Sequence, residues 1–531
     1  MYNKNNVINK FIEHNKKNFY KKKNNFKNKK EIFLIEFNGW QGAQIANSYL
    51  INSIPNIQDC KIVAFESFKI FQKEKTIFLD NLKWYLGSNL KIKNFGIYSS
   101  FGVDKFINEN VYKKFSNKAF KITEKFFKKK ITKKMVENFF IKNVWIGDLI
   151  YDSYLKKYRC YTIDTKSKNF KLFFKECVEI FLYWEDYFIQ NKVKGISVSH
   201  SVYTNAIPLR IASKNNISAF VCVDNQLFKI DKKTCSFRDK TNGFDYQYKC
   251  SRKVFNKLTI NEKKKGLLLG KIFLKKILSG KQKYFYFQNQ NNIKKKKYFF
   301  KKNNKKKIVI FMHSLLDSPH VYGNFIFPDF YEWYKYLSKI SYKTDYDWYI
   351  KPHPNYPDEE KLIRKLIKSN NNIKLLDSKA NNLDLVKQGL SFALTVFGSC
   401  ASELSYLGVK VINAHAHNPH IKYKFSYSAK NLLDYENKIL NLEKMKLNFD
   451  KKELYEYHFM NNYYFHNEYI FEKISNLYKE KNKKPIIYSN ELFKYWLNNF
   501  SIKKHKKICK IFQIFLKSKD YFLSRKHTAL S

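Results

Sequence analysis

Two short motifs in the second half of the chain carry side chains suited to binding phosphate. The first is Lys351-Pro-His353-Pro-Asn, which directly follows an apolar run of strand length. Its two prolines restrict the backbone, so the lysine and the histidine are held in place. A histidine N–H can donate to a phosphate oxygen, and the lysine adds positive charge. The alternative is a rigid strand exit that carries a surface histidine.

The second motif, Gly398-Ser399-Cys-Ala-Ser402-Glu403, follows another apolar run and opens a predicted helix that ends near Gly408. Small residues let a ligand approach the helix N-terminus, where unpaired N–H groups and serine hydroxyls bind phosphate. Glu403 is placed to accept from ribose hydroxyls. The alternative is structural, with Ser399 as the N-cap and Glu403 as a first-turn acid that offsets the helix dipole.

Three residues of the first half are candidates for a general base that would act on a second, acceptor molecule, because the phosphate-binding motifs lie in the second half. His200 follows a predicted strand, and the ordinary histidine pKa of roughly 6.5 suits a general base. Glu36 lies at the end of the first strand beside an Asn-Gly turn, and Asp148 follows Gly147. Either carboxylate needs a raised pKa to act as a base, and otherwise orients the acceptor. Asp148 equally fits a solvated helix face.

The elements that position these residues alternate between strands and helices. Helical segments are predicted at 43–51, 170–192 and 206–214, and another begins at Pro357. Alternation of this kind predicts parallel sheets covered by helices, and therefore two doubly wound α/β domains. Ligands of such sheets bind beyond the carboxyl ends of the strands. Strands are predicted at 31–37, 60–65, 196–199, 219–223, 307–313, 348–351, 373–376, 392–396 and 409–413.

Stretches rich in lysine and asparagine mark the expected domain boundaries. The expected parts are a basic tail (1–30), an N-terminal domain (31–280), a linker (281–307), a C-terminal domain (308–480) and a basic helical segment (481–531).

The two motifs, with Gly408-Val-Lys-Val-Ile behind them, resemble the C-terminal domain of GT-B glycosyltransferases of the bacterial capsule and surface polysaccharide biosynthesis family. Bacterial polysialyltransferases and the glycerophosphotransferases of teichoic acid synthesis are more distantly similar. Other short matches support the resemblance, namely His313-Ser-Leu-Leu-Asp, Phe330-Tyr-Glu-Trp, Gly147-Asp148-Leu-Ile and Ser199-His200-Ser-Val-Tyr.

The resemblance implies two Rossmann-like domains that face each other across a cleft, with the acceptor on the N-terminal side. It implies transfer of a sugar from a nucleotide-sugar donor to a capsule or lipopolysaccharide-type glycan, free or lipid-linked. His353, Ser399 and Ser402 would hold the donor phosphates, and Lys351, Glu403 and His313 are further donor-binding candidates. The short acidic motif that supplies the base in several sialyltransferases is absent, so neither that base nor a CMP-sialic acid donor is carried over.

Two other enzymes would keep the same phosphate site: a GT-B-shaped nucleotide-sugar epimerase and a polyol-phosphate transferase. No cofactor and no metal are expected. The cluster His415, His417 and His420 has no carboxylate at ligand spacing, so we interpret it as a loop wall beside the donor.

The net charge of +56 suggests an acidic partner, but only six of the basic residues are arginines. Readers of phosphates and bases favour arginine, so specific nucleic-acid binding is the weakest interpretation. Eight cysteines without a CxxC pair, and no long apolar run, predict a cytoplasmic protein. Residues 502–523 have a basic amphipathic pattern that predicts peripheral contact with anionic lipid at the inner membrane face. The alternative is a helix packed on the N-terminal domain.

Overall fold

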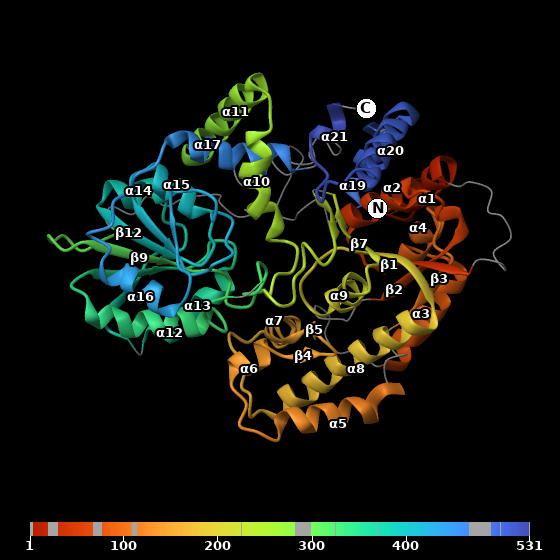
Figure 1. Cartoon of the computed structure of the whole chain (residues 1–531), viewed down its shortest axis with the longest axis horizontal. Helices are drawn as coiled ribbons and strands as arrows, with labels where there is room; N and C mark the ends of the chain where they lie inside the picture. The colour runs from red at the N-terminus through yellow and green to blue at the C-terminus, as the bar shows by residue number, and fades with distance from the viewer. Residues whose placement is uncertain are drawn as a thin grey trace. The chain divides into compact units, whose positions relative to one another are not determined.

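The computed structural model describes residues 4–19, 30–66, 77–108, 114–224, 226–281, 299–323, 325–368, 370–466, 490–499 and 501–529. They form two compact units, each built on one large sheet (Figure 1). The predicted class, two doubly wound α/β domains, is confirmed by the two sheets. The cleft between the domains stays a prediction. Unit 1 comprises Met1–Lys157, Asp164–Phe237 and Tyr464–Ser531, and unit 2 comprises Tyr158–Ile163 and Arg238–Tyr463.

The sheet of unit 1 has six strands in the order β3-β2-β1-β6-β7-β8. Neighbouring strands are parallel except the last pair, β7 and β8, which is antiparallel. Because the chain moves outward from β1 in both directions, the strand order reverses between β1 and β6. The strands are β1 (Glu31–Phe37), β2 (Cys60–Glu66), β3 (Lys105–Ile107), β6 (Lys192–Val198), β7 (Ser218–Val223) and β8 (Gln226–Ile230).

Helices cover both faces of this sheet, since consecutive residues such as Phe33, Leu34 and Ile35 are all buried. Right-handed crossovers place α2 (Gln41–Ser53) and α9 (Ile207–Lys214) on opposite faces (Figure 1). The other elements are α1 (Lys4–Phe19), α3 (Ile77–Leu90), α4 (Asn94–Ser100), α5 (Ser116–Phe127), α6 (Lys133–Glu137), the hairpin β4 (Phe140–Ile141) and β5 (Val144–Trp145), α7 (Gly147–Tyr158), α8 (Lys168–Gln190), α19 (Glu491–Asn499), α20 (Ile502–Lys517), α21 (Lys526–Ala529), and 3₁₀ turns at Ile57–Asp59 and Thr204–Ala206.

Unit 2 repeats this plan with six parallel strands in the order β11-β10-β9-β12-β13-β14, and its order reverses between β9 and β12. The strands are β9 (Lys307–Phe311), β10 (Asp347–Lys351), β11 (Ile373–Leu375), β12 (Leu390–Thr395), β13 (Lys410–Asn413) and β14 (Tyr427–Ser428).

Alternate residues of β9 serve two separate cores in unit 2. Ile308 and Ile310 pack with α12, α13 and α16, whereas Val309 and Phe311 pack with α14 and α15. The helices are α10 (Tyr246–Asn256), α11 (Ile260–Leu278), α12 (Phe330–Ile340), α13 (Pro357–Ile367), α14 (Asn382–Lys387), α15 (Cys400–Tyr406), α16 (Leu432–Leu440) and α17 (Lys451–Phe459), with a 3₁₀ turn at Ser341–Lys343 and a π-helical turn at Met460–Tyr464.

The predicted strands are all present, with ends that differ by a few residues, and Pro357 is the first residue of its helix. Three strands of the two six-stranded sheets were not predicted, because β3, β8 and β14 are short or lie at a sheet edge. The strand predicted at 196–199 begins earlier, at Lys192, and ends at Val198.

The unit boundaries differ from the expected domain boundaries. Helices α10 and α11, expected in the N-terminal domain (31–280), belong to unit 2. Helix α11 lies directly on α17: a Cβ at Gly270 would sit 1.9 Å from the Tyr455 carbonyl oxygen, and one at Gly266 would sit 2.6 Å from the Phe459 ring. The segment Tyr158–Ile163 also belongs to unit 2, where the Thr162 hydroxyl donates to Asp329 at 2.6 Å. Most of the expected linker (281–307) lies outside the described residues.

The C-terminal helix α20 is packed within unit 1. Its apolar residues Ile508, Ile511, Phe512 and Phe515 are buried, and α20 contacts α2. The apolar face that the lipid prediction for 502–523 requires is therefore covered, and the packing alternative describes this helix. No described helix is both long and apolar enough to cross a bilayer.

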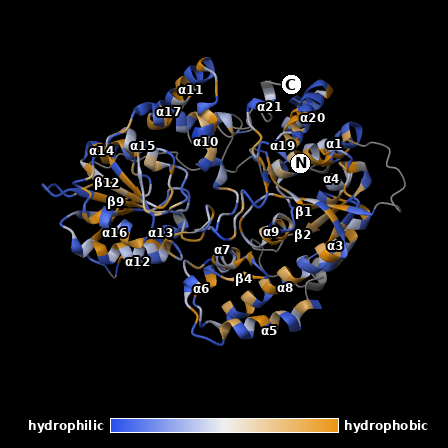
Figure 2. Cartoon of the chain, in the orientation of Figure 1, coloured by the Kyte–Doolittle hydropathy of each residue, from blue (hydrophilic) through white to orange (hydrophobic). Residues whose placement is uncertain are grey.

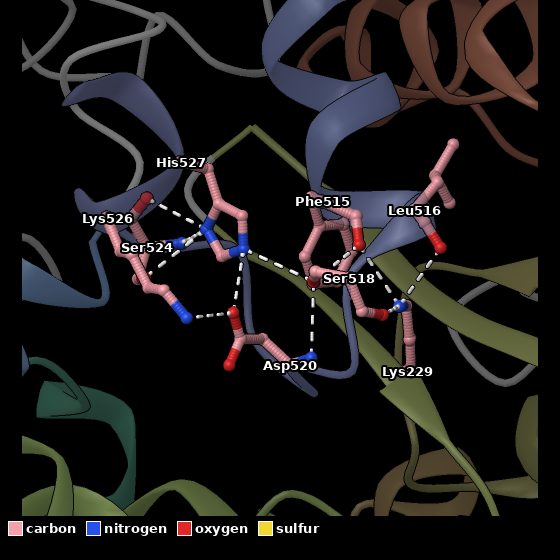
Figure 3. A network of polar contacts seen from close by, with 8 residues as sticks. All are labelled: Lys229, Phe515, Leu516, Ser518, Asp520, Ser524, Lys526 and His527. Carbon is pink, nitrogen blue, oxygen red and sulfur yellow. Dashed lines mark hydrogen bonds and ion pairs between the residues drawn. The ribbon is translucent and has the colours of Figure 1, made fainter. Parts of the chain in front are cut away.

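A half-buried lysine, Lys229, joins the end of α20 to the sheet (Figure 3). The Lys229 Nζ of β8 donates to the carbonyl oxygens of Phe515, Leu516 and Ser518 at 3.1, 3.3 and 2.7 Å. The last carbonyls of a helix lack partners within the helix, and a cation there also offsets the helix dipole. Beyond the helix, the Leu523 N–H donates to the Leu227 carbonyl at 2.9 Å, so the C-terminal segment pairs with the edge strand β8.

We predict that Lys229→Met loosens the C-terminal segment without unfolding unit 1. Unpaired carbonyls at the end of α20 cost about 1–3 kcal/mol, so amide hydrogen exchange over residues 511–523 should accelerate about ten-fold or more. Exchange measured by mass spectrometry tests this, with the exposed Lys519→Met as the matched control. Equal exchange in both variants would contradict the anchoring role.

Candidate functional site

The point of strand-order reversal in unit 2 brings the predicted residue His313 beside the start of the second motif. His313 follows β9, and Phe397 and Gly398 follow β12. The His313 Nε2 accepts the Phe397 N–H at 3.3 Å and lies 3.2 Å from the Thr395 hydroxyl. Glycine is required here, because a Cβ at Gly398 would lie 2.7 Å from the Thr395 oxygen. The chain of β12 therefore passes close beside the histidine of β9.

His313 is a neutral, fixed side chain. Its ring stacks on Phe330 with the centroids 5.1 Å apart, and Phe397 lies 4.3 Å away. Burial, followed by the nearby His353, lowers the pKa of His313 to about 3. Since Nε2 accepts a backbone N–H, the neutral ring carries its proton on Nδ1.

The neighbouring strand β10 supplies the lysine and the histidine of the first motif. Lys351 is buried, and its Nζ donates to the Ser378 carbonyl at 2.9 Å. Burial lowers the pKa of this amine to about 8. The His353 Nδ1 accepts the Asn355 N–H at 3.2 Å, which leaves the proton of the neutral ring on Nε2. Burial and the Lys351 charge lower the pKa of His353 to about 4.

Two polar side chains of the second motif are already hydrogen-bonded within the protein. Ser402 is fully buried and donates to the Ser399 carbonyl at 2.9 Å, and Glu403 accepts from the Asn382 amide at 2.9 Å. Helix α15 has only seven residues and ends before Gly408, so its N-terminus is a weak source of positive charge. Ser399 is the N-cap residue and makes no side-chain capping bond. Ser399 and Glu403 are both half-exposed at the sheet edge, and of these two only Ser399 carries a side-chain donor.

A buried carboxylate that is not among the predicted site residues also shapes this edge. Glu359, near the start of α13, accepts from the Ser314 hydroxyl at 2.6 Å and from the Leu315 N–H at 2.7 Å. These bonds fix the loop that carries His313. The sequence signal was the run of three acids after Pro357, but nothing in it indicates which acid reaches back to β9.

A second missed element is the loop that leads into α10. The Asn242 amide donates to the carbonyls of His320 and Val321 at 3.2 and 2.8 Å, which joins this loop to the one after β9. Asp245, at the end of the loop, is buried beside Lys249 at 2.5 Å and lies 3.8 Å from His417 Nδ1. Burial raises the pKa of Asp245. The signal available in the sequence was the Asn242-Gly turn.

The histidine cluster after β13 is held by its own loop. His415 Nδ1 accepts the His417 N–H at 3.0 Å, and His420 Nδ1 lies 3.3 Å from the Asn413 amide oxygen. In the part of the chain that the structure describes, no group of three or more His, Cys, Asp or Glu side chains is arranged to hold a metal ion.

In unit 1, the point of strand-order reversal lies between β1 and β6 and holds Glu36 and His200. The buried Glu36 carboxylate accepts from the Ser199 N–H at 2.5 Å, from the Ser199 hydroxyl at 2.6 Å and from the Asn205 amide at 2.9 Å. His200 is exposed, with Nδ1 placed 2.9 Å from the Ser199 oxygen. Since the Ser199 proton goes to the carboxylate, the Nδ1 of a neutral His200 is the donor to Ser199. Its Nε2 is then the basic atom.

The loop after His200 is held in a strained conformation. Tyr203 has φ 61° and ψ 179°, a region that is almost exclusive to glycine and costs about 1–3 kcal/mol. The Ser153 hydroxyl of α7 accepts the next N–H, that of Thr204, at 2.9 Å. The loop that carries His200 is thus fixed at both ends.

The third candidate base, Asp148, is engaged elsewhere. Its two oxygens accept from the Arg210 guanidinium at 2.7 and 2.5 Å, and both residues are buried. Arg210 also donates to the Trp145 carbonyl at 2.6 Å and lies over the Trp145 ring. This geometry favours a structural role for Asp148, which joins α7 to α9.

Comparison with known proteins adds little to these observations. No protein family and no characterised protein matches the sequence. Similar solved structures include the β-Kdo 2,4 transferase KpsC of Thermosulfurimonas dismutans, with 13% identity, 51% of this chain and 80% of that chain covered, and a TM-score of 0.32. They also include the UDP-GlcNAc 2-epimerase of Neisseria meningitidis, with 11% identity, 81% and 97% covered, and a TM-score of 0.23. A third is S. aureus MnaA with UDP, with 12% identity, 86% of this chain and 99% of that chain covered, and a TM-score of 0.24.

With TM-scores this low, none of these similarities carries an argument about activity. What the topology defines is an α/β protein of two doubly wound units, each with candidate residues where its strand order reverses. The function is therefore inferred from the residues themselves.

The buried histidines of unit 2 predict a loss of stability in mild acid. Burial lowers the pKa of His420 and His458 to about 3, and that of His417 to about 4. Below the unfolded-state pKa of roughly 6.5, these histidines bind protons in the unfolded chain but not in the folded one. Each of them therefore lowers the free energy of unfolding by up to about 1.4 kcal/mol per pH unit. The thermal midpoint should therefore fall as the pH is lowered from about 6.5 to 5.

Thermal unfolding followed across this pH range provides the measurement. His420→Gln, which removes one of these titrations, should reduce the steepness of the decline. A midpoint independent of pH between about 6.5 and 5 would contradict the burial of neutral histidines.

Proposed function

We propose that this chain is a glycosyltransferase that moves a sugar from a nucleotide-sugar donor to a glycan acceptor. The single observation that carries the proposal is the convergence of His313, Lys351, His353 and Ser399 on one edge of the unit 2 sheet, at its point of strand-order reversal. Three different strand ends contribute to this group. It is the location at which open α/β sheets bind nucleotides.

The donor phosphates would bind through hydrogen bonds to two of these residues. His353 presents an Nε2–H donor from a neutral ring, which can bond a phosphate oxygen without competing for a proton. The Ser399 hydroxyl is the second donor. Lys351, whose pKa of about 8 leaves it mainly charged at neutral pH, supplies positive charge behind them. A bound phosphate would offset the cost of burying that charge.

The other predicted donor-site residues, His313, Ser402 and Glu403, position the loops and helices of the site rather than contact the donor. His313 is bonded through Nε2 to the backbone of Phe397, and thereby fixes the turn that presents Ser399. Ser402 and Glu403 hold the start of α15 and the neighbouring α14. We therefore assign donor contacts to His353, Ser399 and the Lys351 charge.

Activation of the acceptor hydroxyl is assigned to His200 of unit 1. A base needs a lone pair in a fixed orientation. The series Glu36, Ser199 and His200 provides it, because the carboxylate orients the serine and the serine orients the ring. In this proposal His200 Nε2 takes the proton of the attacking hydroxyl, and Glu36 is a positioning residue.

The first test distinguishes transfer from epimerisation, which would use the same donor site without an acceptor. The protein is incubated with CDP-, CMP-, UDP- and GDP-sugars, with and without lipid-linked and free glycan acceptors. A transferase releases nucleotide only when an acceptor is present. Conversion of the donor sugar without any acceptor would instead identify an epimerase.

With the donor identified in this way, His353→Ala and Ser399→Ala should each weaken its binding. A lost hydrogen bond to a charged phosphate is worth about 1.5–3 kcal/mol, so the dissociation constant should rise about ten-fold or more. Calorimetric titration with the donor nucleotide measures this. The control is Ser391→Ala, a serine near the opposite end of β12. Unchanged affinity in both donor-site variants would place the nucleotide elsewhere.

His200→Ala should lower turnover by a factor of about 10² to 10⁴, as expected for the loss of a general base. Its affinity for the donor should stay unchanged. Glu36→Gln should lose less turnover, because the amide still occupies the position between Ser199 and Asn205. Asp148→Asn should instead lower the thermal midpoint, because the buried Arg210 would lose the charge of the carboxylate to which it is hydrogen-bonded. Near-normal turnover in the first two variants would require a base from another residue.

A further inference from the structure

Exposed apolar side chains are concentrated on α3 and the turn after it. Within the described residues, five large apolar side chains between positions 82 and 92 are exposed to solvent, and Figure 2 shows the hydrophobic character of this helix. Isolated exposed leucines are common, but a contiguous group of this kind marks an interaction surface. The five residues, which we call the α3 surface, are Leu82 (43% exposed), Tyr85 (64%), Leu86 (44%), Leu90 (66%) and Ile92 (48%).

The helix is fixed to unit 1 through its opposite face. The Trp84 ring packs edge-on against Phe37 at 5.1 Å and Phe95 at 5.0 Å. Gly87 lies so close to Phe95 that a Cβ there would meet the ring at 2.5 Å. Trp84 and Gly87 point inward, so the α3 surface, with its helical spacing of three and four residues, faces outward.

Lysines predominate among the charged residues beside the α3 surface. Lys83, Lys91 and Lys93 are exposed, and Asp80 is the only acidic residue between Ile77 and Lys93. Lys91 and Lys93 follow the end of the helix with φ 52° each, in a turn closed by the Ile92 N–H bond to the Gly87 carbonyl at 3.3 Å. The turn therefore holds the two lysines beside the apolar residues.

We propose that the α3 surface rests on an anionic lipid bilayer, with its apolar side chains in the interface and its lysines at the lipid phosphates. A helix of 14 residues is about 21 Å long, too short to cross a hydrocarbon core of about 30 Å but long enough to lie in its surface. Charge complementarity selects the occupant. A second copy of this surface would bring lysines against lysines, whereas an anionic surface attracts all three.

The position of α3 gives this lipid contact a functional consequence. Phe37, which Trp84 covers, is the residue after Glu36 at the carboxyl end of β1. The α3 surface is therefore built on the sheet edge that carries the proposed acceptor-activating residues. A bilayer held there would present a lipid-linked acceptor to His200, a consequence that rests on the proposed function, although the lipid contact itself does not.

The test measures co-sedimentation of the full chain with phosphatidylcholine vesicles, with and without phosphatidylglycerol. At about 0.15 M salt the screening length is about 8 Å, which limits the contribution of the many distant lysines. The triple variant Leu82→Ser, Leu86→Ser, Leu90→Ser should need about ten-fold more anionic lipid or more for half-binding. The matched control is Leu432→Ser with Leu433→Ser, two exposed leucines of α16.

Charge reversal supplies a second, independent variant. Lys83→Glu, Lys91→Glu and Lys93→Glu should weaken binding to the anionic vesicles alone. The same change at the exposed Lys503, Lys506 and Lys507 of α20 should matter less. Wild-type protein that fails to sediment with anionic vesicles, or α3 variants that bind like wild type, would overturn the proposal.

Two further measurements separate the alternatives. Sedimentation velocity of wild type and the leucine variant would reveal a second copy as the occupant if a dimer is lost, which also overturns the proposal. Donor titration on the same variants should give wild-type affinity, since α3 carries none of the donor-site residues. A loss of vesicle binding with intact donor binding supports the α3 surface, whichever way the transferase assay turns out.

Discussion

The strand order of each sheet determines where chemistry can occur in this protein. In a parallel sheet every strand ends at the same edge, and helices cover both faces. The loops leave a space beyond that edge only where consecutive connections turn to opposite sides. Both sheets have one such point, between β1 and β6 and between β9 and β12. Glu36 and His200 lie at the first, and His313 and Ser399 lie at the second.

The cation at the point of strand-order reversal in unit 2 is a buried lysine, Lys351, rather than an arginine. A guanidinium would bind a phosphate through two parallel hydrogen bonds, whereas Lys351 is a point charge held by a carbonyl. The two histidines beside it are kept neutral by burial, which lowers the pKa of His313 to about 3 and that of His353 to about 4. The site therefore offers one buried charge and oriented neutral donors, an arrangement that favours a ligand that brings its own negative charge.

Much of the fold followed from the sequence because buried parallel strands are continuous apolar runs. The runs at 31–37 and 307–313 were recognisable without knowledge of their partners, and so were the residues that follow them. Sequence order alone does not reveal how a carboxylate is used. Glu36, Asp148 and Glu359 are all acids near the ends of elements, yet one orients a loop, one pairs with Arg210 and one holds the loop of His313. Each role depends on a residue that is distant in the chain.

The same limitation explains why the basic amphipathic pattern of 502–523 was misleading as a sign of lipid contact. An apolar stripe flanked by lysines has the same sequence signature whether a bilayer or the protein's own core covers it. In α20 the stripe is buried on α2, and Lys229 together with the pairing to β8 holds it there. In α3 the buried contacts are made by Trp84 and Gly87, and the leucines remain outside. The pattern identifies an amphipathic helix, and only the position of its neighbours decides which face is left for a partner.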